Sequence, residues 1–194
     1  MQVLATAITK IFNPAITSLA TIAVAVWVQE IATAQKMLWL ILGLFVATVP
    51  MAVLYLQYKR GQLSSLWSPS ALERRDSYIA WVVTALSFSL LAFWLAAPRL
   101  ILALGLVFLV LGVVNLLATA SLKISVHSEL ITTFVMTAIL TVSVSLIYLA
   151  VLILLVAWAR LRLKAHSVSE VSFGTMLAIL VVYFVFSVFG LATF

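Results

Sequence analysis

Apolar runs of about 20 residues, separated by short polar segments, make up almost the whole chain. A helix of about 20 residues spans the roughly 30 Å hydrocarbon core of a membrane, because each residue adds about 1.5 Å. Within the runs, apolar and polar residues do not alternate with period two, as the strands of a membrane β-barrel require. The pattern therefore predicts an all-α fold: a polytopic transmembrane helical bundle that forms one domain, residues 1–194.

Start and stop signals bound the first four runs. Asn13-Pro14 opens the first, since proline suits the first turn of a helix, where its missing N–H needs no partner. The second ends in an aromatic and basic belt, Tyr58-Lys59-Arg60-Gly61, before the longest loop. We expect helices at about Ala15–Ala34, Met37–Tyr58, Tyr78–Ala97 and Leu100–Ala120, after a weakly amphipathic lead over residues 1–13. Asn115, inside the fourth helix, is expected to face protein rather than lipid.

The apolar run from Leu130 to Trp158 allows two interpretations. As one helix it would be about 43 Å long, more than a membrane core needs, and the chain would cross six times. As two short helices that turn near Ser143-Val144-Ser145, it brings the total to seven, although no glycine or proline marks the turn. Only the second interpretation places His127 and His166 on the same side of the membrane.

The distribution of lysine and arginine favours seven crossings. That count puts all 11 cations except Lys36 and Arg99 on one side, the bias that the positive-inside rule expects of a correct count. The cations that share this side are Lys10, Lys59, Arg60, Arg74, Arg75, Lys123, Arg160, Arg162 and Lys164. We predict seven crossings, the last at about Val171–Phe194, with the amino terminus and both histidines in the cytoplasm and the carboxyl terminus outside.

Composition narrows the class of protein further. Hydrophobic residues make up 66% of the chain, charged residues 8%, and the mean hydropathy is +1.30, which no soluble domain of this size can bury. The net charge of +6 fits membrane topology and contact with anionic lipids, and no basic run is long enough for nucleic acid. Without cysteine, the chain has no disulfide and no thiolate nucleophile or metal ligand.

Two polar islands interrupt the apolar pattern, at residues 121–129 and 159–170, and together they hold both histidines. In the second island, His166 and Glu170 are four residues apart, so on a helix the carboxylate can hold one imidazole nitrogen and leave the other free. Arg160 is a permanent planar cation, suited to bidentate hydrogen bonding with a phosphate. The two islands therefore predict a phosphate-handling site on one face of the membrane.

The first island supplies a second set of candidate groups. Lys123, Ser125 and His127 alternate, so an extended segment would direct a cation, a hydroxyl and an acid–base group to one side. Simpler interpretations exist for each group alone. Cations at the ends of membrane helices often extend to lipid head groups, and a histidine–glutamate pair is often a surface contact. Two such islands on one face, with every histidine of the chain, favour function over these alternatives.

At this point the sequence shows a resemblance to a known family. Ala159-Arg160, five residues, His166, three residues and Glu170 resembles the third signature of the type 2 phosphatidic acid phosphatase superfamily: Ser-Arg, five residues, His, three residues, Asp. Ser125-Val126-His127 resembles its second signature, Pro-Ser-Gly-His. The gap between the two matches suits the pair of short helices that separates the signatures in that family. The resemblance covers about Lys123–Glu170, and elsewhere it is one of architecture.

The resemblance implies an integral membrane lipid phosphatase with its catalytic core at about residues 100–194, in a small bacterial or archaeal branch and hence a prokaryotic cell membrane. It implies His166 as the nucleophile that becomes phosphohistidine, Glu170 as its orienting group and His127 as the proton donor to the leaving group. The phosphate oxygens would be held by Arg160, Lys123 and Ser125. The substrate would be a phospholipid or a polyprenyl phosphate or diphosphate, and no metal or other cofactor would be needed.

The sequence departs from the family at several positions. The first signature, Lys, six residues, Arg-Pro, is absent from its expected place; Lys123 is the candidate for its lysine, and Arg74 or Arg75 for its arginine. Val126 stands where the family has a glycine, Glu170 where it has Asp and Ala159 where it has Ser. These changes leave a phosphotransferase or an inactive relative as alternatives. A small transporter is a further alternative, although the sequence shows no internal repeat or broken mid-membrane helix.

Overall fold

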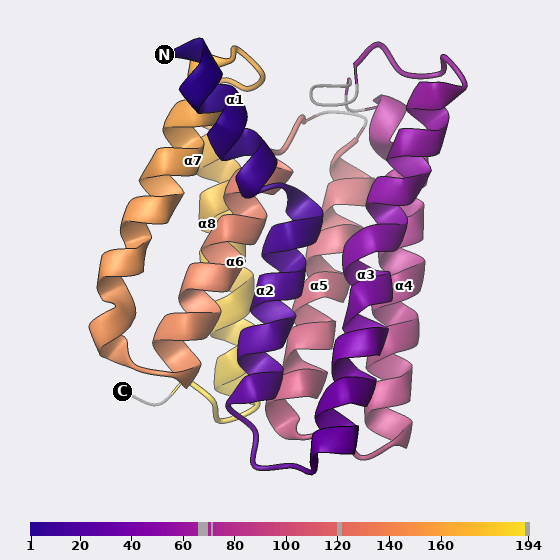
Figure 1. Cartoon of the computed structure of the whole chain (residues 1–194), viewed down its shortest axis with the longest axis vertical. Coiled ribbons are helices and arrows are strands. Elements are labelled where there is room, and N and C mark those ends of the chain that lie inside the picture. Colours follow the sequence, from indigo (N-terminus) through magenta and orange to yellow (C-terminus); the bar gives the residue numbers. More distant parts are fainter. Residues whose placement is uncertain (66–69, 71, 120–121, 193–194) are drawn as a thin grey trace.

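The computed structural model describes residues 1–65, 70, 72–119 and 122–192 (Figure 1). Three residues named above, Ala120, Ser121 and Phe194, lie outside these ranges. The helices are α1 (Gln2–Ile11), α2 (Pro14–Trp27), α3 (Thr33–Lys59), α4 (Arg75–Trp94), α5 (Arg99–Ala118), α6 (Val126–Thr141), α7 (Ala150–Arg162) and α8 (Val168–Val188), with 3-10 helices at Leu72–Arg74 and Val144–Leu149. Within the described residues there is no strand, so the prediction of an all-α fold is confirmed.

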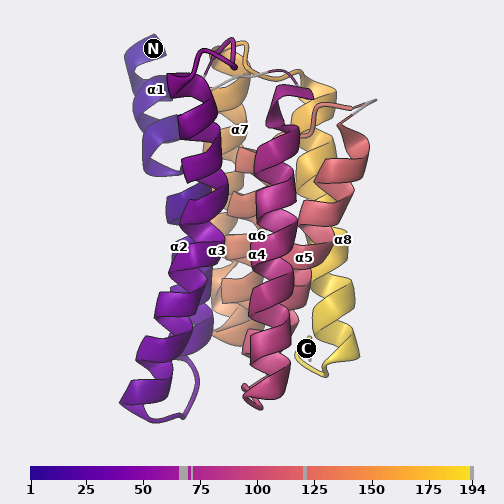
Figure 2. The same ribbon diagram turned by 90° about the vertical axis from the view of Figure 1, so that its right-hand side faces the viewer.

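With α1 and α2 counted as one bent segment, the helices run alternately up and down along one axis, which Figures 1 and 2 show from two sides. Among the residues that the structure describes, five helical segments are long and apolar enough to cross a membrane. The pair α1 and α2, bent by 45° at its junction, provides a sixth when the two are taken together. This set of helices is that of a multi-pass membrane protein. Helix α6 is apolar but only 16 residues long, so the count of seven crossings stays a prediction.

The long apolar run is broken, as the two-helix interpretation expected. α6 ends at Thr141, and the Ser143 hydroxyl accepts a hydrogen bond from the backbone N–H of Ser145 at 3.2 Å as the chain turns. Ser143 thus caps the 3-10 helix that follows the turn, where the sequence has no glycine or proline to signal a break. The chain returns through α7, which packs against α6 (Figure 1). The polar islands that precede α6 and follow α7 consequently lie at the same end of the bundle.

The start of the chain differs from the prediction. Residues 1–13 are more than a lead, because α1 packs its buried Ala5 and Ile8 against α7. The first predicted span, about Ala15–Ala34, is too long, since α2 ends at Trp27 and the polar pair Gln29-Glu30 lies in the connection to α3. The start at Asn13-Pro14 is confirmed: the Asn13 side chain accepts a hydrogen bond from the N–H of Ile16 at 3.1 Å. α2 therefore needs α1 to reach the length of a membrane span.

Helix α6 lies at the centre of the packing. It contacts α2, α7 and α8, and most of its side chains are buried, including the polar Ser128, Glu129 and Thr132. Such groups are costly in lipid but can be satisfied against protein. Its neighbours therefore shield the polar side of α6 from lipid. Asn115 of α5 is likewise 2% exposed, which confirms that it faces protein.

The two ends of the bundle can be distinguished by labelling. We expect a single cysteine at Gln62, in the exposed α3–α4 loop, to react from the cytoplasmic side only, because most lysines and arginines lie in the segments at that end of the helices. A cysteine at Ser145, exposed in the α6–α7 turn, should react only from outside. The measurement is modification of each variant by a membrane-impermeant maleimide in sealed vesicles of known orientation. Labelling of both positions from one side would contradict seven crossings.

Candidate functional site

The two polar islands meet where the segment before α6 packs on the first turns of α8. The backbone N–H of Ser125 donates a hydrogen bond to the carbonyl of Glu170 at 3.3 Å. One turn further along α8, the Ser125 carbonyl lies so close to Gly174 that an added Cβ would stand 2.8 Å from its oxygen. Only glycine permits this approach of one backbone to another. The close packing at Gly174 thus holds the two islands in register.

Gly174→Val tests this contact. We expect a loss of about 1–3 kcal/mol of stability, because the Ser125 carbonyl is backbone and cannot rotate away, together with loss of any activity that needs both islands. The measurement is the unfolding midpoint in mild detergent alongside the activity. Gly112→Ala is the control: in the α4–α5 interface its Cβ would stand 3.3 Å from the nearest atoms, which belong to the side chains of Trp81 and Val82 and not to backbone. Equal losses in the two variants would contradict a special role for Gly174.

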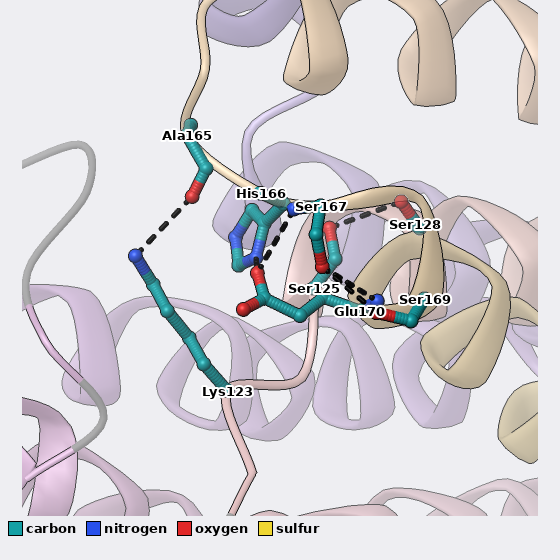
Figure 3. A network of polar contacts seen from close by, with 8 residues as sticks. All are labelled: Lys123, Ser125, Ser128, Ala165, His166, Ser167, Ser169 and Glu170. Atoms are coloured by element: carbon teal, nitrogen blue, oxygen red, sulfur yellow. Dashed lines mark hydrogen bonds and ion pairs between the residues drawn. The ribbon is translucent and has the colours of Figure 1, made fainter.

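Figure 3 shows the centre of the second island, where His166 and Glu170 form a close pair. The Nδ1 atom of His166 lies 2.7 Å from Glu170 Oε2. The same oxygen accepts a hydrogen bond from the N–H of Ser167 at 3.2 Å, and the Ser167 hydroxyl caps α8 by accepting from the N–H of Glu170. The predicted pairing is therefore present. It forms across the cap that starts α8, however, and not along the helix itself.

The His166 ring is electrically neutral. Burial, and then the positive charges of Arg160, Arg74 and Lys123, lower the pKa of His166 from 6.5 to about 2. A neutral ring next to a carboxylate donates its Nδ1 proton to Glu170, so the lone pair of Nε2 stays free. Within the described parts of the chain, this buried Nε2 atom has no hydrogen-bond partner. The ring is thus held in the protonation state and orientation of a nucleophile.

The lowered pKa of His166 makes stability depend on pH. Below pH 6.5 the unfolded chain takes up a proton at this residue and the folded chain does not, so stability is complete above pH 6.5 and falls as the pH decreases. The loss between pH 7 and pH 5 is expected to be about 2 kcal/mol from this residue. The measurement is the free energy of unfolding at both pH values, for the wild type and for His166→Gln. An equal decrease in the two proteins would contradict a strongly lowered pKa.

Part of the prediction for the first island is wrong. Lys123, Ser125 and His127 do not lie along one extended segment, because α6 starts at Val126 and His127 is already in its first turn. The buried Ser125 hydroxyl lies 3.0 Å from the Ser128 hydroxyl and does not line the pocket described below. Lys123 instead joins the second island, where its ammonium donates a hydrogen bond to the Ala165 carbonyl at 3.2 Å (Figure 3). Burial is the main reason why the pKa of Lys123 is lowered.

A pocket beside this cluster holds the other predicted residues. Arg74, His127 and Arg160 line it, and all three are buried. Its empty volume is about 700 Å³, partly open to the surroundings, and its walls are mainly apolar side chains of α2, α3, α4 and α6. Both arginines also interact electrostatically with both imidazole rings. The cations and histidines from the two islands and the α3–α4 loop therefore converge at one end of the bundle.

The structure separates the two arginines that the sequence left as alternatives. Arg74 is 7% exposed and lines the pocket, whereas Arg75 is exposed and does not. Tyr78 of α4, which the sequence reasoning missed, is buried in the pocket wall, and its hydroxyl hydrogen-bonds with the Arg74 guanidinium. The spacing of four residues was the available signal, because residues i and i+4 share one helical face. Arg74 is thus the better candidate for a phosphate ligand from this loop.

The described residues were also compared with the ligand sets that metal ions need. Among the residues that the structure places, no group of three His, Asp or Glu side chains could hold a metal ion. The expectation of metal-independent chemistry is still a prediction, to be tested with a chelator.

No family model, no curated protein and no solved structure matches the chain. Function is therefore inferred from the residues and geometry of the site.

Proposed function

We propose that the protein is a membrane-embedded lipid-phosphate phosphatase that works through a phosphohistidine at His166. The observation that carries the proposal is the free, buried Nε2 of a neutral His166 whose Nδ1 is held by Glu170, next to three cations. A neutral imidazole nitrogen is a nucleophile for phosphorus, and the positive charges stabilise the charge that the transferring phosphoryl group carries. This arrangement supports the same roles that the sequence resemblance implies.

The proposed reaction has two steps. In the first, Nε2 of His166 bonds to phosphorus while the ester P–O bond breaks, and the leaving oxygen takes a proton from His127, which enters this step as the imidazolium. In the second, water attacks the phosphohistidine, gives a proton to His127, and releases inorganic phosphate and free His166. Arg74, Arg160 and Lys123 hold the phosphoryl oxygens throughout, since most of the catalysis of phosphoryl transfer is positioning and electrostatic stabilisation.

The shape of the pocket supports a substrate with a lipid tail. Val46, Pro50 and Leu54 of α3 and Trp81 of α4 form an apolar wall that continues from Arg74 and His127. A lipid substrate must keep its tail apolar while its phosphate reaches charged groups, and this pocket offers both environments side by side. Lipid-linked phosphates, either phospholipid or polyprenyl, therefore fit the site better than water-soluble phosphate esters.

Phosphate release by the purified protein in detergent micelles tests the proposal. The substrates are phosphatidic acid, a polyprenyl phosphate and a polyprenyl diphosphate, each with and without a chelator and with an added alcohol as a competing acceptor. We expect release that a chelator does not abolish. Arg74→Gln should lower it about 100-fold through lost charge stabilisation, whereas Arg75→Gln, at an exposed cation outside the pocket, should not. Transfer to the alcohol would indicate a phosphotransferase, and no reaction of any substrate would reject the proposal.

A further inference from the structure

Glu129 is a buried acidic group that the proposed reaction does not use. It lies in α6, two residues after His127, and its side chain is 0% exposed. The Nδ2 atom of Asn115 in α5 donates to both of its oxygens, at 2.9 Å to Oε1 and 2.8 Å to Oε2, and also to the Leu111 carbonyl at 2.9 Å. The pair thus links α5 and α6 at the level of the active-site histidine.

Glu129 and His127 point in opposite directions from the same helix. Two residues correspond to about 200° around an α-helix, so the face that holds Glu129 against α5 lies opposite the face that carries His127. The His127 face, with Val126 and Leu130, lines the pocket. Rotation or sliding of α6 would therefore move His127 out of the pocket and break the Asn115–Glu129 hydrogen bonds at the same time.

Joining two helices through this pair has a cost in free energy. A carboxyl and an amide in an apolar interior lose their hydration, and Asn115 Oδ1 is buried without a hydrogen-bond partner in the described part of the molecule. Apolar side chains of similar size would pack at least as stably, since replacing buried polar pairs in this way is often neutral or stabilising. An apolar contact is not directional, so it allows one helix to rotate or slide against the other. A hydrogen-bonded pair does not allow this.

We propose that Asn115 and Glu129 are positioning residues that fix α6 so that His127 faces the pocket. The kinetic part of this inference rests on the proposed function, in which His127 protonates the leaving group. Proton transfer of this kind matters most when the leaving group is poor. Loss of the pair should therefore slow reactions of substrates with poor leaving groups much more than those with good ones, as loss of His127 itself would do.

The kinetic test compares two phosphate esters that differ in their leaving group, an alkyl ester and a nitrophenyl ester. Glu129→Leu, Asn115→Leu and the double variant should slow the alkyl ester about 100-fold, the range of general acid catalysis, and the nitrophenyl ester much less. Glu129→Gln, whose amide oxygen can still accept from Asn115, should retain most activity with both. Thr137→Val is the control, because Thr137 is also buried in α6 and its hydroxyl has no hydrogen-bond partner among the described residues. Equal slowing of both esters would overturn the inference and leave the proposed function intact.

A second measurement does not depend on activity. In a His166→Gln background His127 is the only histidine of the chain, so modification by diethyl pyrocarbonate reports on it alone. Glu129→Leu in that background should change the modification rate about tenfold, equivalent to about 1.4 kcal/mol, and Glu129→Gln should not. An unchanged rate with Leu would overturn the inference. A wild type that hydrolyses no phosphate ester would reject the proposed function, while a changed rate would still support the positioning of His127.

Discussion

His166→Gln is expected to abolish phosphate release, by about 10⁴-fold or more, because it removes the atom that attacks phosphorus. Glutamine is polar and of similar size, so the loop before α8 should keep its conformation. The measurement is single-turnover phosphate release, together with trapping of radioactive phosphate on the wild-type protein as an acid-labile phosphohistidine. Vanadate, which resembles the five-coordinate transition state, should inhibit the wild type.

The matched control for His166 is Lys164→Gln, at an exposed position in the same loop. It removes a cation near the surface and should leave turnover close to that of the wild type. A His166→Gln protein with ordinary phosphatase activity would show that the phosphohistidine mechanism is wrong. Another nucleophile would then have to attack phosphorus, for example a water molecule activated by His127 in the pocket.

Glu170→Gln is expected to have the second largest effect, a loss of about 10³-fold to 10⁴-fold in turnover. The amide cannot supply the negative charge that holds the Nδ1–H of His166, and a neutral orienting group allows the wrong tautomer. The fold should survive, because glutamine at this position can replace glutamate in a capping box. The measurements are turnover and unfolding midpoint in the same preparation.

Ser167→Ala separates the two roles of Glu170. It removes the hydroxyl that accepts from the Glu170 N–H and should lower stability by about 1 kcal/mol, while the charge next to His166 remains. If Ser167→Ala reduced turnover as much as Glu170→Gln, capping and not charge would explain the effect of Glu170. Glu170→Asp restores the side chain of the family signature and would show whether the shorter carboxylate also orients His166.

The sequence predicted contacts between residues close together in the chain better than it predicted which distant residues meet in the site. The spacing of His166 and Glu170 is short-range, and a pairing four residues apart can be inferred from helix geometry even though a cap produced it. The polar interruption at Ser143-Val144-Ser145 likewise indicated a break between α6 and α7. In both cases neighbours along the chain determine the result.

Long-range contacts were harder to predict. Nothing in the spacing of Asn115 and Glu129 identifies them as partners, because their contact depends on how α5 and α6 pack. The choice between Arg74 and Arg75 depends on which side chain the start of α4 turns inward. The alternation of Lys123, Ser125 and His127 misled, since three residues do not distinguish an extended segment from the start of a helix.

The pocket is assembled from two sets of helices with separate tasks. Its cations and its histidine come from Arg74 and from the ends of α6 and α7, which supply His127 and Arg160, whereas α3 contributes only apolar side chains such as Val46 and Leu54. Substitutions on this face of α3 can therefore reshape the space for a substrate tail without altering the charged groups. During evolution, related chains could therefore change which substrate tail they accept, in length or branching, and keep the same charged groups. An engineer could alter the same face to select one lipid from a mixture.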